Sequence, residues 1–210
     1  MKELIIIGAG GMGRTIYSNA LESIGYGQSF SVKGFIDDNL HALDSFENYP
    51  PVIGTIRDYT PQENDVFVSS IGGPSRRPCM EEIIRRRGEF CDLIHKTARI
   101  YTNAKLGKGN FIGAYSVIGN DAQIGDYNMI QAYSVIGHDA RLGNWNRIDT
   151  HVTCVGGIVI EDEVNIHTSA VISHGVTVGS GSHVGALSFV IRKVKPGTTV
   201  MGNPAKKVEY

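Results

Sequence analysis

The sequence predicts two parts of different architecture: an α/β domain over residues 1–95 and a parallel β-helix over residues 96–210. From Ile100 to Val190 every sixth residue is Ile, Leu or Val, apart from Cys154. A period of six fits neither an α-helix nor a single strand, so it indicates a solenoid of hexapeptide repeats. Before residue 95, apolar runs alternate with helical patterns, as in a parallel sheet covered by helices.

A second period, of eighteen residues, accompanies the first. The segment 114–119, Ala-Tyr-Ser-Val-Ile-Gly, recurs unchanged at 132–137. Three hexads therefore form one coil of a triangular prism, and residues eighteen apart stack in neighbouring coils. Gly follows the aliphatic residue in eight of the sixteen hexads. We expect these glycines at the corners, where a Cβ would crowd the turning chain.

The elements expected before residue 95 follow from apolar runs and the residues that interrupt them. Leu4–Ile7 is an unbroken apolar run, which is typical of a strand buried on both faces. A Gly-rich turn and a helix over 14–23 follow it. Further elements are expected as strands at 32–36, 51–56, 65–71 and 91–94 and as a helix over 77–87.

Gly8, Gly10 and Gly13 form a G-x-G-x-x-G pattern between the first strand and the first helix. Glycines there permit a tight turn and let backbone N–H groups at the helix N-terminus approach phosphate oxygens. Asp37 or Asp38, after the second strand, is placed to bind a ribose. The domain is about half a full dinucleotide fold, so it has room for one nucleotide-sized ligand. A tight turn that only packs helix on strand is the alternative.

The whole chain resembles the hexapeptide-repeat sugar acetyltransferases, among them bacillosamine-pathway and perosamine N-acetyltransferases and sialic acid O-acetyltransferase relatives. The resemblance implies a left-handed β-helix and a Rossmann-like half domain that binds the nucleotide of a nucleotide-linked amino sugar. The motifs that carry it are Ile7-Gly8-Ala9-Gly10-Gly11, Gly34-Phe35-Ile36-Asp37-Asp38-Asn39, Ile71-Gly72-Gly73, the repeats, and the tail over 195–208. The substrate-binding residues that it implies are Gly8, Gly10, Gly11, Asp37, Asp38 and Gly72.

A comparison of two coils identifies a candidate general base. Asn120-Asp121 lies eighteen residues before His138-Asp139, so the repeat keeps the Asp and changes Asn to His. Imidazole is suited to accept a proton near neutral pH as a nucleophile attacks a thioester. The family's catalytic site has the same His-Asp arrangement. Asp139 either orients His138 or only hydrogen-bonds the corner backbone, as Asp121 would.

The acyl-donor site departs from the family pattern. Relatives commonly have a second His nine residues on, near the acetyl carbonyl, and this chain has Arg147 there. Arginine donates hydrogen bonds to an oxyanion but cannot act as a base. Lys193 and Lys207 are further candidates for the coenzyme's phosphates. The predicted acetyl-CoA-binding residues are Arg147, Gly156, Gly157, Ser173, His174, Gly185, Ala186 and Lys206.

The function predicted on these grounds is acetyl-CoA-dependent N-acetylation of a nucleotide-linked amino sugar, with a UDP-4-amino-4,6-dideoxy sugar as the expected acceptor. The resemblance also implies a homotrimer with active sites between subunits. O-acetylation of a sugar such as sialic acid, an NAD-dependent reaction and a non-catalytic scaffold are the alternatives. His138 and His174 lie thirty-six residues apart, as zinc ligands would in a β-helix, but Gly179 stands where a third would follow, so no metal is expected.

Composition narrows the remaining classes. The net charge of −1 disfavours nucleic acid as a partner, and no apolar run reaches the ~18 residues of a membrane span. Because an expected strand follows the first residues directly, we expect no secretory signal. Cys79, Cys91 and Cys154 have no metal or redox spacing. A cytoplasmic protein with structural thiols is expected.

Overall fold

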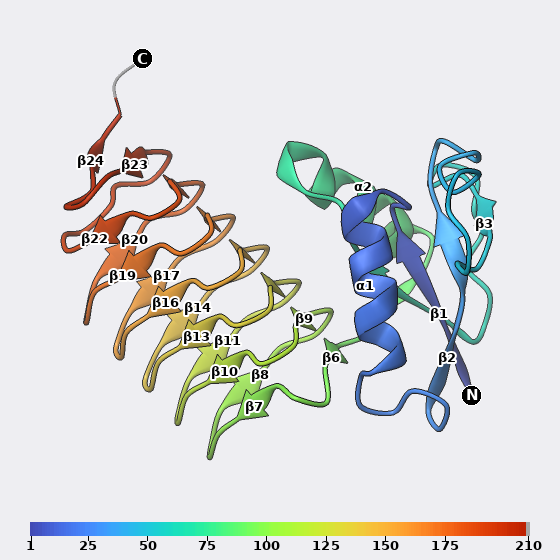
Figure 1. The fold of residues 1–210 in the computed structure, drawn as a ribbon, viewed down its shortest axis with the longest axis horizontal. Coiled ribbons are helices and arrows are strands. Elements are labelled where there is room, and N and C mark those ends of the chain that lie inside the picture. The colour runs from blue at the N-terminus through green and yellow to red at the C-terminus, as the bar shows by residue number, and fades with distance from the viewer. Residues whose placement is uncertain (209–210) are drawn as a thin grey trace. The chain divides into compact units, whose positions relative to one another are not determined.

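The computed structural model describes residues 1–208, which form two compact units, Met1–Lys96 and a second that begins at Thr97 (Figure 1). The first unit contains a parallel sheet in the order β3-β2-β1-β4-β5. Its elements are β1 (Lys2–Ile7), α1 (Gly11–Leu21), β2 (Phe30–Ile36), β3 (Val52–Gly54), β4 (Asp65–Ser69), the 3₁₀ helix η1 (Gly73–Ser75), α2 (Arg76–Arg85), β5 (Glu89–Phe90) and β6 (Leu93–Ile94).

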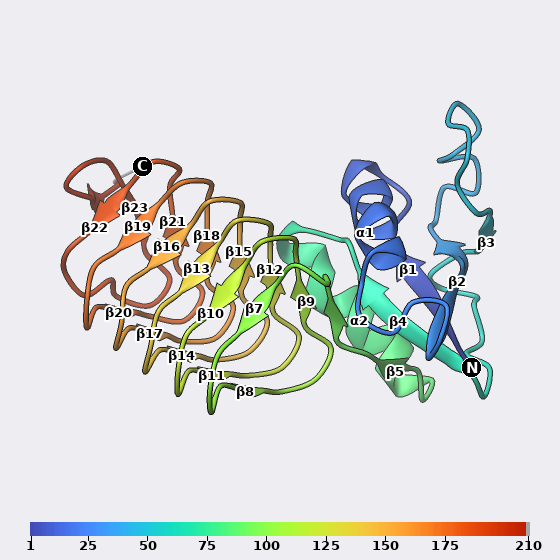
Figure 2. The same ribbon diagram turned by 60° about the horizontal axis from the view of Figure 1, so that its bottom comes forward.

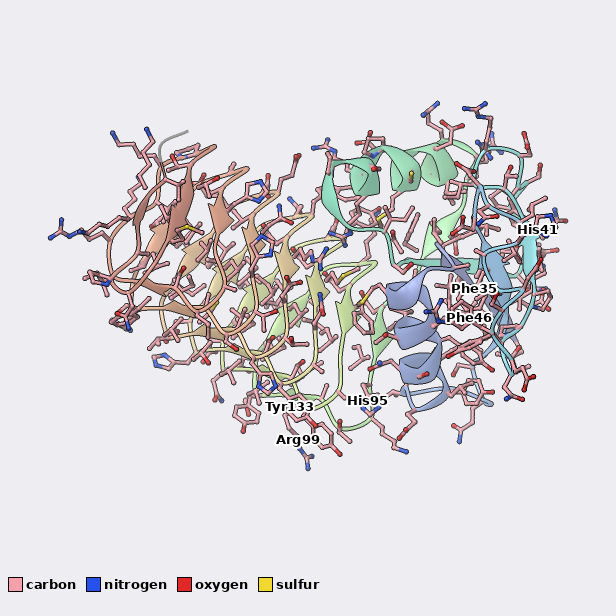
Figure 3. All side chains as sticks on the ribbon, turned by 45° about the horizontal axis from the view of Figure 1, so that its top comes forward. Phe35, His41, Phe46, His95, Arg99 and Tyr133 are labelled. Atoms are coloured by element: carbon pink, nitrogen blue, oxygen red, sulfur yellow. The ribbon has the colours of Figure 1, made fainter. Side chains whose placement is uncertain are left out.

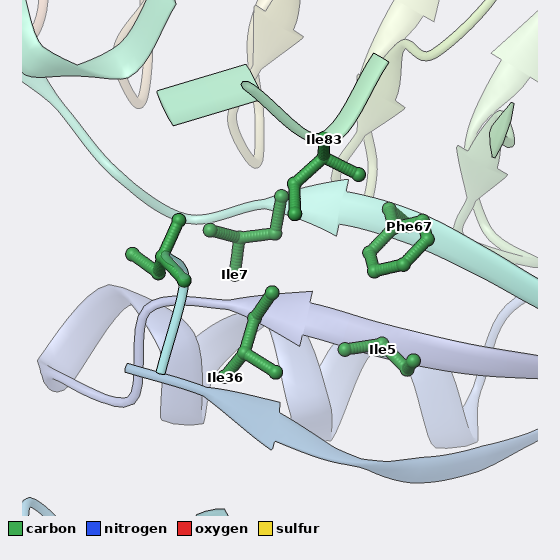
Figure 4. Close-up of a cluster of buried hydrophobic side chains, with 6 residues drawn as sticks. Ile5, Ile7, Ile36, Phe67 and Ile83 are labelled. Carbon is green, nitrogen blue, oxygen red and sulfur yellow. The ribbon is translucent and has the colours of Figure 1, made fainter. Parts of the chain in front are cut away.

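The two helices cover opposite faces of this sheet. Ile83 of α2 packs with Ile5, Ile7 and Phe67 in one buried cluster (Figure 4). Tyr17 of α1 lies 6.1 Å from Phe35, ring centroid to ring centroid, on the other face. Because side chains alternate along a strand, covering both faces requires apolar residues at successive positions. This explains the uninterrupted apolar run of β1.

The observed bounds differ from the predicted ones mainly at helix ends. The first helix begins at Gly11 rather than residue 14, because the Gly-rich segment itself becomes helical. The second ends at Arg85, and Arg87 then adopts a left-handed φ of 64°, which ends the helical path. The strand expected at 91–94 is shortened to β6, Leu93–Ile94, and β5 at Glu89–Phe90 precedes the predicted strand. Within residues 1–208, no helix is both long and apolar enough to cross a membrane.

A buried carboxylate ties the amino-terminal ends of the strands together. The side chain of Asp65 is fully buried and accepts hydrogen bonds from Lys33 Nζ (2.7 Å) and Tyr59 Oη (2.8 Å). The backbone N–H of Gln62 donates to it as well. Burial by itself raises the pKa of Asp65, but these bonds outweigh burial, so the pKa lies below its ordinary value.

The second unit is a parallel β-helix in which three faces repeat along the chain (Figure 2). The first face contains β7 (Arg99–Ile100), β10 (Val117–Ile118), β13 (Val135–Ile136), β16 (Thr153–Cys154), β19 (Val171–Ile172) and β22 (Phe189–Val190). The second contains β8 (Lys105–Leu106), β11 (Gln123–Ile124), β14 (Arg141–Leu142), β17 (Val159–Ile160) and β20 (Thr177–Val178). The third contains β9 (Phe111–Ile112), β12 (Met129–Ile130), β15 (Arg147–Ile148), β18 (Asn165–Ile166), β21 (His183–Val184) and β23 (Thr199–Met201), with β24 (Lys206–Lys207) antiparallel to β23.

Three corners join these faces, and each recurs every eighteen residues. The first corner (137–140 and its equivalents) links the first face to the second. The second corner (143–146) links the second face to the third, and the third corner (149–152) leads into the next coil. From β7 to β22, each strand pairs with the strand eighteen residues away without a shift in register, for example Ile118 with Ile136, whereas β23 pairs with β21 at a spacing of sixteen. The predicted eighteen-residue coil is therefore correct.

The interior contains the aliphatic column and a ladder of buried asparagines. Ile118, Ile136 and Cys154 are fully buried, and burial raises the pKa of the Cys154 thiol to about 12. Asn128 Nδ2 donates to Asn110 Oδ1 (3.1 Å), and the N–H of Asn146 donates to Asn128 Oδ1 (2.9 Å). Each asparagine thus links its coil to a neighbouring one.

The glycines lie at the corners, as predicted, and a Cβ there would crowd the chain. The left-handed backbone position of each corner is often a non-glycine residue, such as Tyr133 (φ 61°) or Asp139 (φ 56°). The glycines after the aliphatic residue serve close approach instead: a Cβ on Gly137 would lie 2.6 Å from the backbone nitrogen of Gly156. At the third corner the left-handed residues form an exposed stack, in which the ring centroids of Tyr133 and His151 lie 5.0 Å apart; Figure 3 labels Tyr133.

We predict that Asp65→Asn lowers the free energy of unfolding by about 2–3 kcal/mol at pH 7, because Lys33 and Tyr59 lose a buried charged partner. The pKa of Asp65 is depressed in the folded state, so its stabilisation is present above the unfolded carboxyl pKa of about 4 and is lost as pH falls through the folded pKa. Urea unfolding of both proteins between pH 7 and pH 3 measures this. Asp58→Asn, at an exposed carboxylate, is the control. A stability difference that stays constant over this range would contradict the prediction.

Candidate active site

His138 lies on the first corner, immediately after the Gly that follows β13. Its Nδ1 is 2.7 Å from Asp139 Oδ2. With a carboxylate at Nδ1, that nitrogen carries the proton, and Nε2 is the nitrogen available as a base. One coil earlier, Asp121 uses its carboxylate differently and accepts a hydrogen bond from Asn103 Nδ2 (2.9 Å). The same left-handed corner Asp therefore gains a new partner where the repeat changes Asn to His.

The ring of His138 lies over Gly156, in the coil that follows. A Cβ on Gly156 would collide with His138 Nε2, and no other side chain is among its nearest neighbours. His174 continues the column, with its ring centroid 6.5 Å from that of His138. The N–H of Gly157 donates to the carbonyl of His138 (2.8 Å). The first corner therefore brings together six predicted residues: His138, Asp139, Gly156, Gly157, Ser173 and His174.

Other predicted coenzyme residues lie elsewhere on the β-helix. Gly185 and Ala186 are on the third corner, where Gly185 is buried under Met201 and donates its N–H to Val200. Lys206 is exposed on β24. Four cations line a cavity of about 350 Å³ near the tail. Lys193 and Lys207 were predicted as phosphate contacts, whereas sequence reasoning missed Arg192 and Lys195. Three cations within residues 192–195 were the sequence feature that could have identified them.

Arg147 is on the third face and belongs to a polar cluster. Its Nε donates to Asp149 Oδ1 (2.6 Å). Asp149 is 7% exposed and also contacts Gln131 Nε2 (2.5 Å) and His167 Nδ1 (3.1 Å). In a triangular prism the third face lies opposite the first corner, so one chain does not bring Arg147 and His138 together. Asp149, Gln131 and His167 were not among the predicted site residues.

In the first unit, the predicted residues lie at the carboxyl ends of adjacent strands β2, β1 and β4. Gly8 has a left-handed φ of 93°, and a Cβ on Gly13 would collide with the carbonyl of Gly8. These two glycines are explained by the turn and by close helix packing. Gly10 is different, because a Cβ there would meet nothing within 4 Å. Packing therefore does not require glycine at position 10, and the open space is suited to a ligand at the N-terminus of α1.

The two aspartates after β2 bind backbone groups of this edge. Asp37 accepts hydrogen bonds from the N–H groups of Ala9 (2.7 Å) and Asn39 (2.8 Å), so it braces the Gly-rich loop. Asp38 Oδ1 accepts from the N–H of Ile56 (3.1 Å). Gly72 caps η1 at the end of β4. The aspartates thus shape the edge of the sheet, in addition to any contact with a ribose or base.

Sequence reasoning missed a cation at the same edge. The guanidinium of Arg14 lies 3.6 Å from the centroid of the Phe46 ring, which Figure 3 places beside α1. A Cβ on Gly11 would lie 4.0 Å from Arg14 Nη2, so this charge borders the N-terminus of the helix. Arg14 could have been predicted at this edge, because it directly follows the last glycine of the motif. No sequence feature predicted that Phe46 would contact it.

Among the described residues, no group of three or more His, Cys, Asp or Glu side chains is arranged to hold a metal ion. The ring centroids of His138 and His174 lie 6.5 Å apart, and Gly179 stands where the third histidine of a β-helix zinc site would follow.

Comparisons with known proteins agree with this architecture. Residues 3–84 match the family described as PglD N-terminal domain. The acetyltransferase domain of PglB from Neisseria gonorrhoeae, solved in complex with acetyl coenzyme A, is 28% identical, with a TM-score of 0.88 and 99% of each chain covered. PerB from Caulobacter crescentus, solved with CoA and GDP-perosamine, is 25% identical, with a TM-score of 0.86, and the match covers 100% of this chain and 98% of that one.

A curated relative, 2,3,4,5-tetrahydropyridine-2,6-dicarboxylate N-acetyltransferase from Staphylococcus aureus, is 46% identical over 52 residues, which are 25% of this chain and 22% of that protein. The match to such curated relatives thus spans only about a fifth of their length. The predicted fold, a small α/β part followed by a left-handed β-helix, is confirmed, and so is the resemblance to hexapeptide-repeat sugar acetyltransferases. The acyltransferase class agrees with all of these relatives.

We predict that Gly156→Ala displaces the His138 imidazole without unfolding the chain. The new Cβ would occupy the space of the ring, and the ring is a side-chain end that can rotate away. The imidazole Cε1–H signal of His138 in NMR spectra should shift, while the melting temperature stays within about 1–2 °C. In a His138→Ala background the same substitution should have no effect on other histidine signals. An unchanged His138 signal would contradict this placement of the ring.

Proposed function

We propose that this chain, whose structure is that of the hexapeptide-repeat sugar acetyltransferases, transfers the acetyl group of acetyl-CoA to the amino group of a nucleotide-linked amino sugar. The observation that carries the proposal is the His138–Asp139 pair over Gly156. It supplies an exposed, oriented imidazole nitrogen beside the backbone of Gly156 and Gly157, which carry no side chains. Such a site can hold a thioester next to a base.

In the proposed reaction, Nε2 of His138 accepts a proton from the attacking amine, and Asp139 stabilises the charged ring. The C–N bond forms at the thioester carbon, the C–S bond breaks, and the proton passes to the coenzyme A thiolate. Asp139 holds the tautomer that this role requires. Gly156, Gly157, Ser173 and His174 would border the pantetheine. Lys193 and Lys207, with Arg192 and Lys195, would meet phosphates of the coenzyme.

The first unit would bind the nucleotide of the acceptor. Open space at Gly10, the N-terminus of α1 and the nearby Arg14 guanidinium suit a diphosphate. The edge shaped by Asp37, Asp38 and Gly72 would receive the ribose or base. We retain a UDP-4-amino-4,6-dideoxy sugar as the expected acceptor. The GDP-perosamine bound to PerB makes a GDP-linked sugar the second acceptor to test.

We further propose a homotrimer, in the cytoplasm, with active sites between subunits. The support is geometric: His138 and Arg147 lie on opposite sides of one prism. A site that uses both must take Arg147 from a second copy of the chain. O-acetylation of a sugar hydroxyl by the same base is the second candidate, since the base serves either nucleophile.

The first test is a thiol-release assay with acetyl-CoA against UDP- and GDP-linked amino sugars and free sialic acid. We expect turnover on a nucleotide amino sugar, and His138→Ala should lower kcat by about 10²–10⁴-fold, since general-base catalysis contributes that much. His151→Ala, a histidine on the third corner, is the matched control and should keep the parent rate. Full activity of His138→Ala would refute the mechanism, and turnover on sialic acid alone would favour O-acetylation.

The subunit arrangement has its own test. His138→Ala and Arg147→Ala proteins, each of low activity, are mixed, dissociated in mild urea and reassembled. Mixed oligomers should contain some sites with both His138 and Arg147, so activity should recover to at least several times that of either variant. No recovery, with mixed oligomers present by native mass spectrometry, would contradict a site shared between subunits.

A further inference from the structure

The third corner departs from the hexapeptide repeat in three consecutive coils. The position after the aliphatic residue is Gly in the coils at 113 and 185, as in much of the repeat. Between them it is Gln131, Asp149 and His167, which stack at eighteen-residue spacing. A Cβ at Gly113 would lie 2.8 Å from the backbone nitrogen of Ala132. The three coils thus replace the small residue of the repeat by side chains that hydrogen-bond one another.

Asp149 is the centre of this polar cluster. Its Oδ1 accepts from Gln131 Nε2 (2.5 Å) and Arg147 Nε (2.6 Å), and its Oδ2 lies 3.1 Å from His167 Nδ1. Both oxygens are therefore engaged, and the residue is buried. The ring of His167 also stacks on that of His183, 6.3 Å away. These contacts leave the carboxylate a single orientation.

The bond through Nε leaves the outer edge of the Arg147 guanidinium unoccupied. Within residues 1–208, Nη1 and Nη2 of Arg147 make no hydrogen bond, and the side chain is 31% exposed. An arginine on a strand normally samples many rotamers. Asp149 therefore restrains the guanidinium through Nε, while two of its nitrogens remain available to a ligand.

We propose that Asp149 is a positioning residue: it holds Arg147 so that its terminal nitrogens donate to the carbonyl oxygen of the acyl donor. This inference rests on the proposed function. When the amine attacks, the C–N bond forms and the carbonyl π electrons move to oxygen, where two N–H groups meet the negative charge. The C–S bond then breaks, and the proton taken by His138 passes to the thiolate. Arg147 gives up no proton.

A donor fixed before the reaction costs no reorganisation as the oxyanion forms. Asp149 would therefore affect the acyl-donor half of the reaction through Arg147, and not the sugar half. Gln131 and His167 brace the carboxylate from the coils on either side. Loss of the carboxylate should then have no consequence once Arg147 is gone, which a purely structural role of Asp149 does not predict.

The test is a double-mutant cycle with Asp149→Asn and Arg147→Ala, read by calorimetric binding of acetyl-CoA and of CoA and by kcat. Asp149→Asn should weaken acetyl-CoA about 10-fold relative to CoA and lower kcat about 10–100-fold, with the KM of the sugar unchanged. In the Arg147→Ala background it should change neither. Asp162→Asn is the matched control, because Asp162 accepts hydrogen bonds from Asn144 in the same kind of coil-to-coil ladder but, within residues 1–208, forms no ion pair with an arginine.

Equal losses from Asp149→Asn with and without Arg147, or the same loss from Asp162→Asn, would overturn the proposal. Thermal unfolding of each variant identifies any loss that comes from misfolding. The binding arm needs no acceptor. If acetyl-CoA discrimination depends on Asp149 while every sugar in the panel is inert, the proposed acceptor is wrong and the role of Asp149 stands.

Discussion

The backbone hydrogen bonds between successive coils decide which side chains of the β-helix can meet. From β7 to β22, each strand pairs with the strand eighteen positions away, for example Ile118 with Ile136, and the register does not shift. A side chain therefore contacts the residue one coil above or below it. Because each coil buries its aliphatic residues only against its neighbours, the same hydrogen bonds also hold the core together. Side chains that act together on one corner are therefore stacked at eighteen-residue spacing, in columns that run from coil to coil.

Two such columns carry the candidate chemistry. On the first corner, the sequence His138, Gly156, His174 gives the imidazole of His138 room to lie over a glycine. On the third corner, Gln131, Asp149 and His167 take the position that is Gly113 in the coil before them and Gly185 in the coil after them. A glycine in one column thus makes space for the imidazole of His138, and in the other column larger residues in place of glycine form a polar cluster. At these corners the chain turns through residues with left-handed φ, such as Asp139 and His151.

The first unit follows another constraint, that of a parallel sheet whose carboxyl strand ends share one edge. Gly10, Asp37 and Gly72 come from three segments far apart in the sequence but follow three neighbouring strands. Both carboxylate oxygens of Asp37 accept hydrogen bonds from backbone N–H groups of that edge. The opposite edge is stabilised by Asp65 with Lys33 and Tyr59. The open space at Gly10 and the buried Asp65 cluster therefore lie at opposite ends of the strands.

The sequence by itself determined the periodic features of this protein. A hexad repeat without a slip permits only a solenoid, and the change from Asn120 to His138 against a repeated background identified the candidate base. The strand and helix order of the first unit followed from unbroken apolar runs and the glycine motif. Helix ends were less certain, because Gly11 and Arg87 are determined by local backbone conformation rather than by hydrophobic pattern.

Only the tertiary structure decided which polar side chains meet. The partners of Arg147 are Asp149, two residues away, and through it Gln131 and His167, each eighteen residues from Asp149. The separation of Gly185 and Ala186 from the first corner likewise depends on where the prism turns. Arg14 and Phe46 meet through a loop without any period. These contacts depend on side-chain rotamers and on the geometry of the corners. Neither produces a periodic pattern in the sequence from which the contacts could be predicted.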